Sequence, residues 1–162
     1  MRIVAFVGPS DSGKTRLITR LVEEFHRRGL KTGVIKHCGH GFELDPEAKD
    51  SRRFWEAGAE GVALLGPRKW AVIRRSPPEK RAAQLAAQLF ADQDIVLVEG
   101  GKREPGIRKI GVQGAGSGGN LLLEAGELAA VISEEDLQGE VPVFRPDQIR
   151  AIADLIMNEE DK

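Results

Sequence analysis

A phosphate-binding loop near the start of the chain constrains the fold more than any other feature. Residues 8–15 read GPSDSGKT, which matches the pattern G-x-x-x-x-G-K-[ST] in full. The apolar run 3–7 precedes this block, and a stretch of helical periodicity over residues 14–28 follows it. A glycine-rich turn of purely structural purpose would not explain a lysine followed by a hydroxyl residue at the helix start. The sequence therefore predicts a nucleoside triphosphate site built on a strand, a loop and a helix.

Each residue type in this block has a chemical reason to be there. The glycines let the backbone curl so that successive N–H groups point at phosphate oxygens. The lysine reaches the β- and γ-phosphates, the hydroxyl next to it ligates Mg²⁺, and the helix adds its positive N-terminal end. The expected nucleotide-binding residues are Gly8, Ser10, Asp11, Ser12, Gly13, Lys14, Thr15 and Arg16.

Composition narrows the class of protein. A length of 162 residues suits one domain, and we expect a single P-loop nucleotide-binding domain over residues 1–162. The 24 basic and 25 acidic residues give a net charge of −1, which favours neither nucleic acid nor a membrane surface as partner. No stretch has the apolar length of a membrane span or the pattern of a signal peptide. With one cysteine and hence no intrachain disulfide, the sequence predicts a cytoplasmic protein.

The order of periodic segments predicts an α/β fold. Strands are indicated by apolar runs at 3–7, 32–35, 62–65, 70–73, 94–99, 108–112, 128–132 and 141–144. The runs 62–65 and 70–73 are expected to pair with each other as a hairpin. Helices are expected at 14–28, 50–57 and 79–90, with a closing helix from Pro146. Alternating strands and helices favour a P-loop NTPase-like, mostly parallel sheet with helices on both faces. The most apolar strand, 94–99, is expected to be central, and Leu85, Ala86 and Leu89 are expected to face inward.

An acidic residue at the end of the most apolar strand is the second candidate for chemistry. Glu99 closes the run LVE and is followed by two glycines, which allow a sharp turn beside the phosphates. In P-loop proteins a carboxylate at such a strand end holds Mg²⁺, often through water, or polarises a water molecule. A glutamate that only ends a strand at the surface is the alternative. We expect Glu99 to serve Mg²⁺ together with Thr15, and to be a candidate catalytic group.

A loop rich in histidine and glycine follows the second strand. It reads KHCGHG from Lys36, and lies at the carboxyl edge of the expected sheet, on the same side as the P-loop. His37, Cys38 and His40 are possible metal ligands, although their spacing matches none of the usual structural zinc patterns. A site shared across a two-fold axis and a loop that only faces ligand or solvent both remain open. Asp50 is a second candidate catalytic carboxylate, or an N-terminal cap of the short helix.

Basic residues follow the Glu99 strand. Lys102, Arg103, Arg108 and Lys109 are expected to cluster at the edge where a phosphorylated ligand or a partner docks, and scattered surface charge is the equally weighted alternative. The sequence has no Asn-Lys-x-Asp motif, so it does not state a base preference through that device. Gly114, Gly116 and Gly119 fit a dinucleotide-binding pattern, but the apolar segment after them is too short for the required helix.

Four blocks together resemble the MobB family, the adapter proteins of molybdopterin-guanine dinucleotide biosynthesis. The blocks are GPSDSGKT, GVIKHCGHGFELD, KDSRRFWEAGA and DIVLVEGGK, and their order and spacing agree from Ile3 to about Val112. The resemblance implies a P-loop fold, a preference for GTP with Mg²⁺, weak intrinsic hydrolysis and a homodimer. It also implies partnership with the molybdenum cofactor guanylyltransferase, which attaches GMP to the molybdopterin intermediate.

Residue by residue, the resemblance assigns phosphate and Mg²⁺ to Ser12, Gly13, Lys14 and Thr15. It also implies that Lys36, His37, Asp50 and Glu99 line the site. One position departs from the family pattern: Gly101 stands where the family usually has an aromatic residue between the glycine and the lysine of the EG-x-K block. The ligand contacts of that loop therefore do not transfer in detail.

Two other functions fit the residues less well. A metallochaperone-type GTPase would use His37, Cys38 and His40 across a dimer. A small ATP-dependent kinase would share the P-loop, but it would need an arginine-rich lid, which the sequence does not offer. The leading hypothesis is a nucleotide-binding accessory protein that is at most a weak GTPase.

Overall fold

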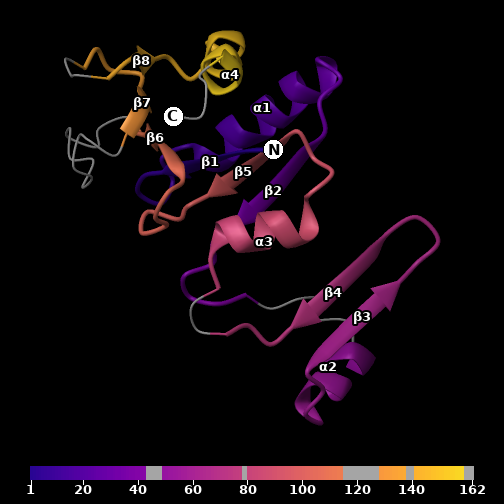
Figure 1. Ribbon diagram of the computed structural model, residues 1–162. Helices are drawn as coiled ribbons and strands as arrows, with labels where there is room; N and C mark the ends of the chain where they lie inside the picture. The colour runs from indigo at the N-terminus through magenta and orange to yellow at the C-terminus, as the bar shows by residue number, and fades with distance from the viewer. Residues whose placement is uncertain (43–48, 78–79, 115–127, 138–140, 159–162) are drawn as a thin grey trace. The chain divides into compact units, whose positions relative to one another are not determined.

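The computed structural model describes residues 1–42, 49–77, 80–114, 128–137 and 141–158. The elements in chain order are β1 (Arg2–Val7), α1 (Lys14–Arg27), β2 (Thr32–Lys36), α2 (Lys49–Glu56), β3 (Gly61–Leu65), β4 (Trp70–Arg74), α3 (Ala82–Leu89), β5 (Ile95–Glu99), β6 (Arg108–Val112), β7 (Leu128–Ile132), β8 (Val143–Phe144) and α4 (Ile149–Asn158) (Figure 1). The chain divides into a sheet unit, Met1–His37 with Arg81–Lys162, and a hairpin unit, Cys38–Lys80. The single-domain expectation for residues 1–162 stays a prediction.

The sheet unit contains a six-stranded sheet in the order β2-β5-β1-β6-β7-β8. Every neighbouring pair in it is parallel, which confirms the predicted α/β fold class. β5 lies between β2 and β1, so it is an inner strand, although β1 and β6 occupy the middle of the sheet. Its first four residues are completely buried, as the continuous apolar run predicts for a parallel strand with both faces covered.

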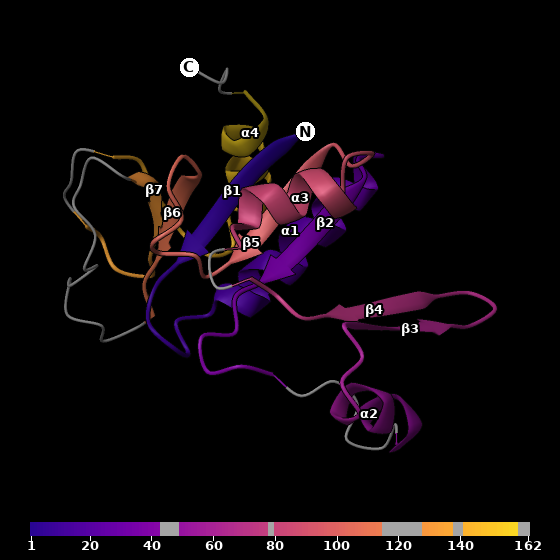
Figure 2. The ribbon, with the colours of Figure 1, turned by 60° about the horizontal axis from the view of Figure 1, so that its bottom comes forward.

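Helices cover both faces of this sheet. Alternate residues of β1 divide between two cores: Val4 and Phe6 face α1 and α4, while Ala5 and Val7 face α3. Figures 1 and 2 show α3 on the opposite side of the sheet from α1. The larger core, under α1 and α4, holds Phe6, Leu21, Phe25, Ile110, Ile132, Ile152 and Ile156, each almost fully buried. None of the described helices has the length and apolar content needed to cross a membrane.

The predicted helices exist, with changed ends. α1 ends one residue before the predicted limit, and Gly29 closes it at φ +78°, the left-handed conformation typical of a glycine after a helix. α3 begins at Ala82, whereas the predicted helix began at Glu79, a residue outside the described part of the chain.

The inward orientation predicted for Leu89 is wrong, since 51% of its surface is exposed. The next residue, Phe90, packs its ring against Gly33 of β2. The contact is so close that a Cβ on Gly33 would lie 2.8 Å from the Phe90 ring. The glycine loop predicted at 114–119 falls outside the described residues after Gly114.

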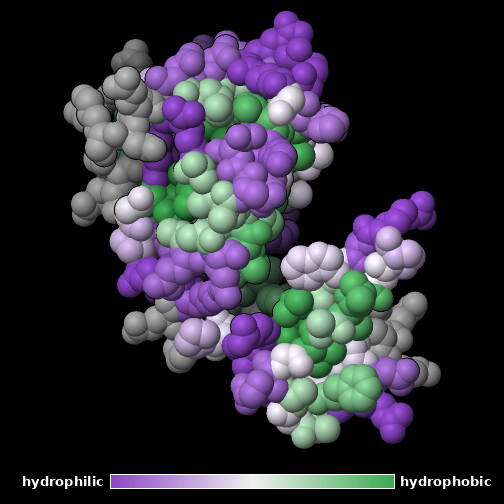
Figure 3. Space-filling view, turned by 45° about the vertical axis from the view of Figure 1, so that its right-hand side comes forward, coloured by the Kyte–Doolittle hydropathy of each residue, from purple (hydrophilic) through white to green (hydrophobic). Residues whose placement is uncertain are grey.

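The hairpin unit consists of α2 and the antiparallel pair β3–β4. Leu65 pairs with Trp70 at the turn and Gly61 with Arg74 at the open end, which confirms the predicted hairpin. The Arg75 guanidinium lies 4.4 Å from the centroid of the Trp55 ring and also donates to the Trp55 carbonyl, so it joins the hairpin to α2. Figure 3 shows apolar residues at the surface of this unit. The exposed large hydrophobic side chains of the unit are Phe42, Phe54, Leu64, Leu65, Trp70 and Val72.

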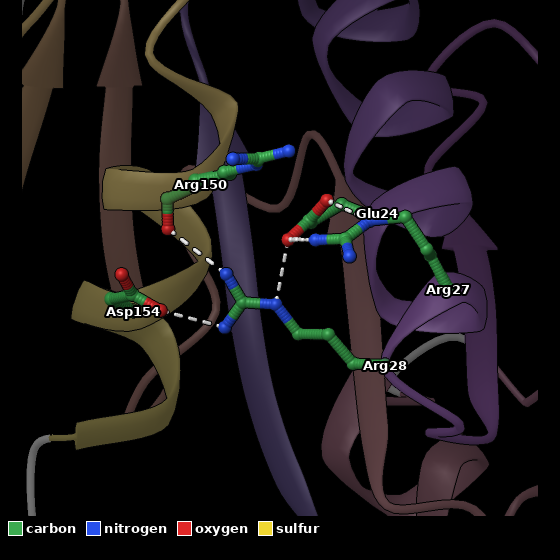
Figure 4. A network of polar contacts seen from close by, with 5 residues as sticks. All are labelled: Glu24, Arg27, Arg28, Arg150 and Asp154. Carbon is green, nitrogen blue, oxygen red and sulfur yellow. Dashed lines mark hydrogen bonds and ion pairs between the residues drawn. The ribbon is translucent and has the colours of Figure 1, made fainter.

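A charged network fixes α1 to α4 at the rim of the larger core (Figure 4). Glu24 is only 8% exposed and accepts from Arg27 at 2.6 and 3.0 Å and from Arg28 at 2.7 Å. Arg28 also donates to the Asp154 carboxylate at 2.6 Å and to the Arg150 carbonyl at 3.2 Å. The hydrogen bonds from Arg27 and Arg28 lower the pKa of Glu24 to about 2.

This network predicts an acid-sensitive contribution to folding. The pKa of Glu24 is lower in the folded than in the unfolded chain, so its stabilisation is fully present above about pH 4.3, the ordinary value. It is lost as the pH falls toward about 2. Glu24→Gln should therefore lower the urea midpoint at pH 7, and the gap to wild type should narrow at pH 3. A gap that stays constant between these pH values would contradict the assigned pairing.

Candidate functional site

The P-loop connects β1 to α1 and has the backbone conformation of an anion-binding loop. Gly13 lies at φ +89° directly before the helix, and Asp11 lies at φ +59°, a conformation that non-glycine residues seldom adopt. The loop passes so close to β6 that a Cβ on Gly8 would lie 2.1 Å from the Val112 carbonyl oxygen. The glycine predicted to allow the curl is thus required at position 8 by contact with a neighbouring strand.

The first turn of α1 offers its N–H groups to a ligand. Among the described residues no side chain caps this end of the helix, and the turn carries no acidic residue. Unpaired N–H groups and the helix dipole together favour an anion at this point. Ser12 is buried in the loop below, with 7% of its surface exposed. These features fit a phosphate group held by the backbone of the loop.

The Lys14 ammonium bends back over the same loop. It donates to the Gly8 carbonyl at 3.1 Å and to the Ser12 hydroxyl at 3.2 Å, and it also contacts the Pro9 carbonyl. Burial lowers the pKa of Lys14 below its ordinary value, while the nearby carboxylates of Glu99 and Asp11 act in the opposite direction. These hydrogen bonds therefore hold the Lys14 amine against the backbone of the P-loop.

Glu99 lies beside the P-loop, as predicted from the end of its strand. Parallel pairing of β5 with β1 sets Glu99 opposite Phe6, two residues before Gly8. Thr15 Oγ1 donates to Glu99 Oε2 at 2.9 Å, and Lys36 Nζ lies 3.2 Å from Glu99 Oε1. A hydroxyl and a carboxylate oxygen in contact are the hard ligands that Mg²⁺ prefers, so these two residues fit a magnesium site.

A buried glutamate that the sequence did not single out holds His37. The Nε2 atom of His37 lies 3.0 Å from Glu104 Oε1, and Glu104 is 7% exposed. The turn between the two acidic residues is made by Gly100 at φ +91° and Gly101 at φ +75°. A Cβ on Gly101 would lie 3.1 Å from Glu104 Cγ and 3.5 Å from His37 Cδ2. The departure from the family pattern at position 101 thus accommodates a left-handed turn beside this pair.

The predicted metal-ligand and catalytic candidates of the KHCGHG loop and α2 lie in different units of the chain. Cys38, His40 and Asp50 belong to the hairpin unit, whereas His37 belongs to the sheet unit. Across the described part of the chain, no three His, Cys, Asp or Glu side chains are arranged to hold a metal ion. Asp50 lies in the first turn of α2, where an acidic residue favours the helix. A metal role for the histidine and cysteine loop stays a prediction.

Only two residues of the predicted basic cluster are exposed in the structure. Lys102 and Arg103 are exposed in the turn after Glu99. The edge position predicted for Arg108 and Lys109 is wrong, because Lys109 is 5% exposed within β6 and Arg108 donates to the Leu155 carbonyl of α4. A role of Lys102 and Arg103 in docking an anionic ligand or a partner stays a prediction.

A cavity of about 540 Å³ adjoins the P-loop at the carboxyl ends of β6, β7 and β8. Ser12, Gly13 and Arg16 form its wall on the loop side, and Gln113, Glu134 and Arg145 line it beyond the strand ends. No sequence motif connects these last three residues, since each follows a different strand. Only the strand order brings them together.

Comparison with known proteins agrees with this geometry. The family model of molybdopterin guanine dinucleotide synthesis protein B, MobB, matches residues 3–134. The chain belongs to the MobB family. This membership confirms the resemblance carried by the P-loop, the KHCGHG loop and the LVEGGK strand end.

Individual MobB relatives match over different lengths. The molybdopterin-guanine dinucleotide biosynthesis adapter protein of Escherichia coli K12 is 31% identical over 96% of this chain and 91% of its own. The adapter protein of that name from Haemophilus influenzae is 39% identical, but the match spans 64% of this chain and 58% of the relative. The crystal structure of Bacillus subtilis MobB superimposes with a TM-score of 0.78 at 27% identity, covering 98% of this chain and 97% of that one.

Proposed function

We propose that the protein is a GTP-binding adapter in molybdopterin-guanine dinucleotide biosynthesis, with weak intrinsic GTPase activity. The observation that carries the proposal is a complete P-loop, in contact with Glu99, in a chain that matches an adapter protein over nearly its whole length. The loop supplies the backbone and the lysine for a triphosphate. Membership of the MobB family indicates the pathway in which this nucleotide site would operate.

Thr15 and Glu99 would hold Mg²⁺ together with the nucleotide. A bound Mg²⁺ would supply positive charge that offsets the negative charge of the nucleotide phosphates. Lys14 contributes a second positive charge on the same phosphates, and Lys36 orients the Glu99 carboxylate through its ion pair. These residues bind and orient the nucleotide without any covalent step on the protein.

The proposal includes slow hydrolysis, because Glu99, one of the two candidate bases, already has both carboxylate oxygens in contact with other side chains. A general base has to lie within hydrogen-bond reach of the attacking water. Both oxygens of Glu99 are engaged, one by Thr15 and the other by Lys36. Asp50 remains the second candidate, in the hairpin unit. The nucleotide therefore acts better as a bound signal than as a rapidly consumed substrate.

The expected partners are the molybdenum cofactor guanylyltransferase, the molybdopterin intermediate and a second copy of the chain. The exposed apolar side chains of the hairpin unit support a protein contact, since Leu65 is 90% and Trp70 68% exposed. An isolated two-stranded hairpin is marginally stable, so covering this face in a homodimer would stabilise it. Lys102 and Arg103 offer charge to an anionic cofactor or partner surface. We place the protein in the cytoplasm, where a single cysteine stays reduced.

The adapter role is tested by reconstituting guanylyl transfer. Purified guanylyltransferase, molybdopterin and GTP are incubated with and without the protein, and molybdopterin-guanine dinucleotide is quantified over time. The proposal predicts a faster or more complete conversion when the protein is present. Equal conversion across a range of protein concentrations would contradict the adapter assignment.

The magnesium role of Glu99 gives a separate prediction. Glu99→Gln should raise the Kd for GTP about tenfold in Mg²⁺, because one charged ligand contact is lost. In EDTA the variant and the wild type should differ by less than about twofold, since the carboxylate then has no ion to hold. Fluorescent GTP titration measures both, and Glu23→Gln, an exposed glutamate on α1, serves as the matched control. An equal loss in Mg²⁺ and EDTA would assign Glu99 a purely structural role.

A further inference from the structure

The cavity beside the P-loop is continuous with the place where the phosphates bind. Ser12 and Gly13 belong to both the loop and the cavity wall, and Arg16 extends that wall along the first turn of α1. Its volume of about 540 Å³ falls within the range of small-molecule sites. A ligand that has its phosphates in the loop can therefore extend into the cavity.

Strand order decides on which side of the P-loop the rest of a nucleotide lies. On the β5 side, the strand end is filled by Glu99 with Lys36 and by the pair of His37 with Glu104. On the β6 side, the strand ends open into the cavity. Ligands of open α/β sheets bind at the carboxyl ends of the strands, which is where this cavity lies. The base and ribose therefore have room beyond β6 and β7.

Glu134 is held at this cavity by a tight turn. Ser133 is 2% exposed, and its N–H donates to the Phe144 carbonyl at 3.0 Å, which fixes the end of β7 to β8. The Ser133 hydroxyl accepts from the Glu135 N–H at 2.9 Å, closing the turn around residue 134. Glu134 lines the cavity, whereas its neighbour Glu135 does not. A carboxylate is thus placed by the backbone at the end of a strand.

A carboxylate in this position distinguishes the two purines. The Watson–Crick edge of guanine carries two adjacent donors, N1–H and the N2 amino group, and a carboxylate accepts from both. Adenine carries an acceptor at N1, which a carboxylate repels. A site that hydrogen-bonds donors of its ligand rejects an analogue that lacks them. Gln113, which is 6% exposed at the cavity wall, adds an amide that can donate to the O6 oxygen of guanine.

The other acidic residue of the cavity wall, Asp147, is less suited to this task. It precedes α4, where its carbonyl accepts from the Ile149 N–H at 2.8 Å, and it also borders a second hollow along α4. An aspartate just before a helix has a structural reason to be there. Asp147 thus provides a direct comparison for Glu134.

We propose that this cavity holds the base and ribose of GTP and that the Glu134 carboxylate selects guanine in place of an Asn-Lys-x-Asp motif. The inference rests on the proposed function, because it assumes a triphosphate in the P-loop, and it adds the residue that sets base specificity. It assigns a role to a segment, Ser133 to Asp136, that the sequence pattern leaves without one.

The test compares Glu134→Gln with the matched variant Glu135→Gln, using GTP, ATP and XTP as probes in calorimetric titrations. Xanthine has a carbonyl where guanine has its 2-amino group, so a glutamine amide can donate to it. Glu134→Gln should weaken GTP binding about 10- to 100-fold, strengthen XTP binding and leave ATP binding within about twofold. Glu135→Gln should leave all three Kd values within about twofold, and circular dichroism should show both variants folded.

The outcomes separate this inference from the function on which it rests. An unchanged ratio of GTP to ATP affinity in Glu134→Gln would overturn the role of Glu134, as would an equal effect of Glu135→Gln or a larger one of Asp147→Asn. In those cases wild-type binding of GTP would still support the P-loop assignment. A wild type that binds neither GTP nor ATP would overturn both.

Discussion

Replacing Lys14 with alanine should weaken GTP binding about a hundredfold while the protein stays folded. In the absence of nucleotide the ammonium contacts only atoms of its own loop, Gly8, Pro9 and Ser12, and no core packing depends on it among the described residues. With a triphosphate bound, the same amine faces two phosphate groups. Hydrogen bonds to charged partners contribute about 1.5–3 kcal/mol each, so losing them costs about 3 kcal/mol.

The measurement is a calorimetric GTP titration of wild type and Lys14→Ala, with thermal melting followed by circular dichroism. Lys69→Ala, an exposed lysine at the tip of the β3–β4 hairpin, controls for the loss of one positive charge. We expect equal melting temperatures for all three proteins and a large change in the Kd for GTP in Lys14→Ala only. GTP affinity that survives in Lys14→Ala would refute the nucleotide assignment.

Replacing Gly8 with alanine should damage both folding and binding. The added methyl group would lie 2.1 Å from the Val112 carbonyl oxygen and 3.1 Å from the Ser12 hydroxyl. A carbonyl in a strand cannot move alone, because β6 is paired with β1 at Val7 and with β7 at Ile132. The loop would have to shift away from the sheet, at a cost of about 3 kcal/mol, comparable to overpacking in a core. That loss corresponds to a fall in melting temperature of roughly 10 °C.

Gly39→Ala is the matched control for Gly8→Ala. No described atom lies within 4 Å of a Cβ at position 39, and the backbone there is not left-handed. This variant should melt within about 1 °C of wild type and bind GTP normally. A Gly8→Ala protein that melts and binds like wild type would show that the loop can move away from β6 at little cost.

The sequence predicted the parts of the site that a local motif or a strand end defines. Gly8 to Thr15 form a continuous block, and Glu99 follows from the rule that parallel strands end at one edge of the sheet. Glu104 could not be found in this way, because its contact with His37 depends on how the Gly100–Gly101 turn folds back. Glu134 was equally inaccessible, since its place at the cavity depends on β7 lying two strands from β1.

The errors in the fold prediction have the same origin. Leu89 was expected to face inward from helical spacing, but Phe90 takes the contact with Gly33 where α3 ends. Lys109 was expected at an exposed edge, in a docking cluster or as scattered surface charge, yet it is 5% exposed on β6, an inner strand. Periodicity describes one element at a time, whereas burial at an element's end or on an inner strand depends on its neighbours.

The most direct test of the account is a titration of the wild-type protein with GTP in the presence of Mg²⁺. The P-loop with its uncapped helix end, Lys14, Thr15 and Glu99 predicts saturable binding at one site per chain, weakened when EDTA removes the metal ion. The same titration with ATP should give weaker binding. The absence of saturable GTP binding, with or without Mg²⁺, would contradict the central claim that this chain carries a nucleotide site.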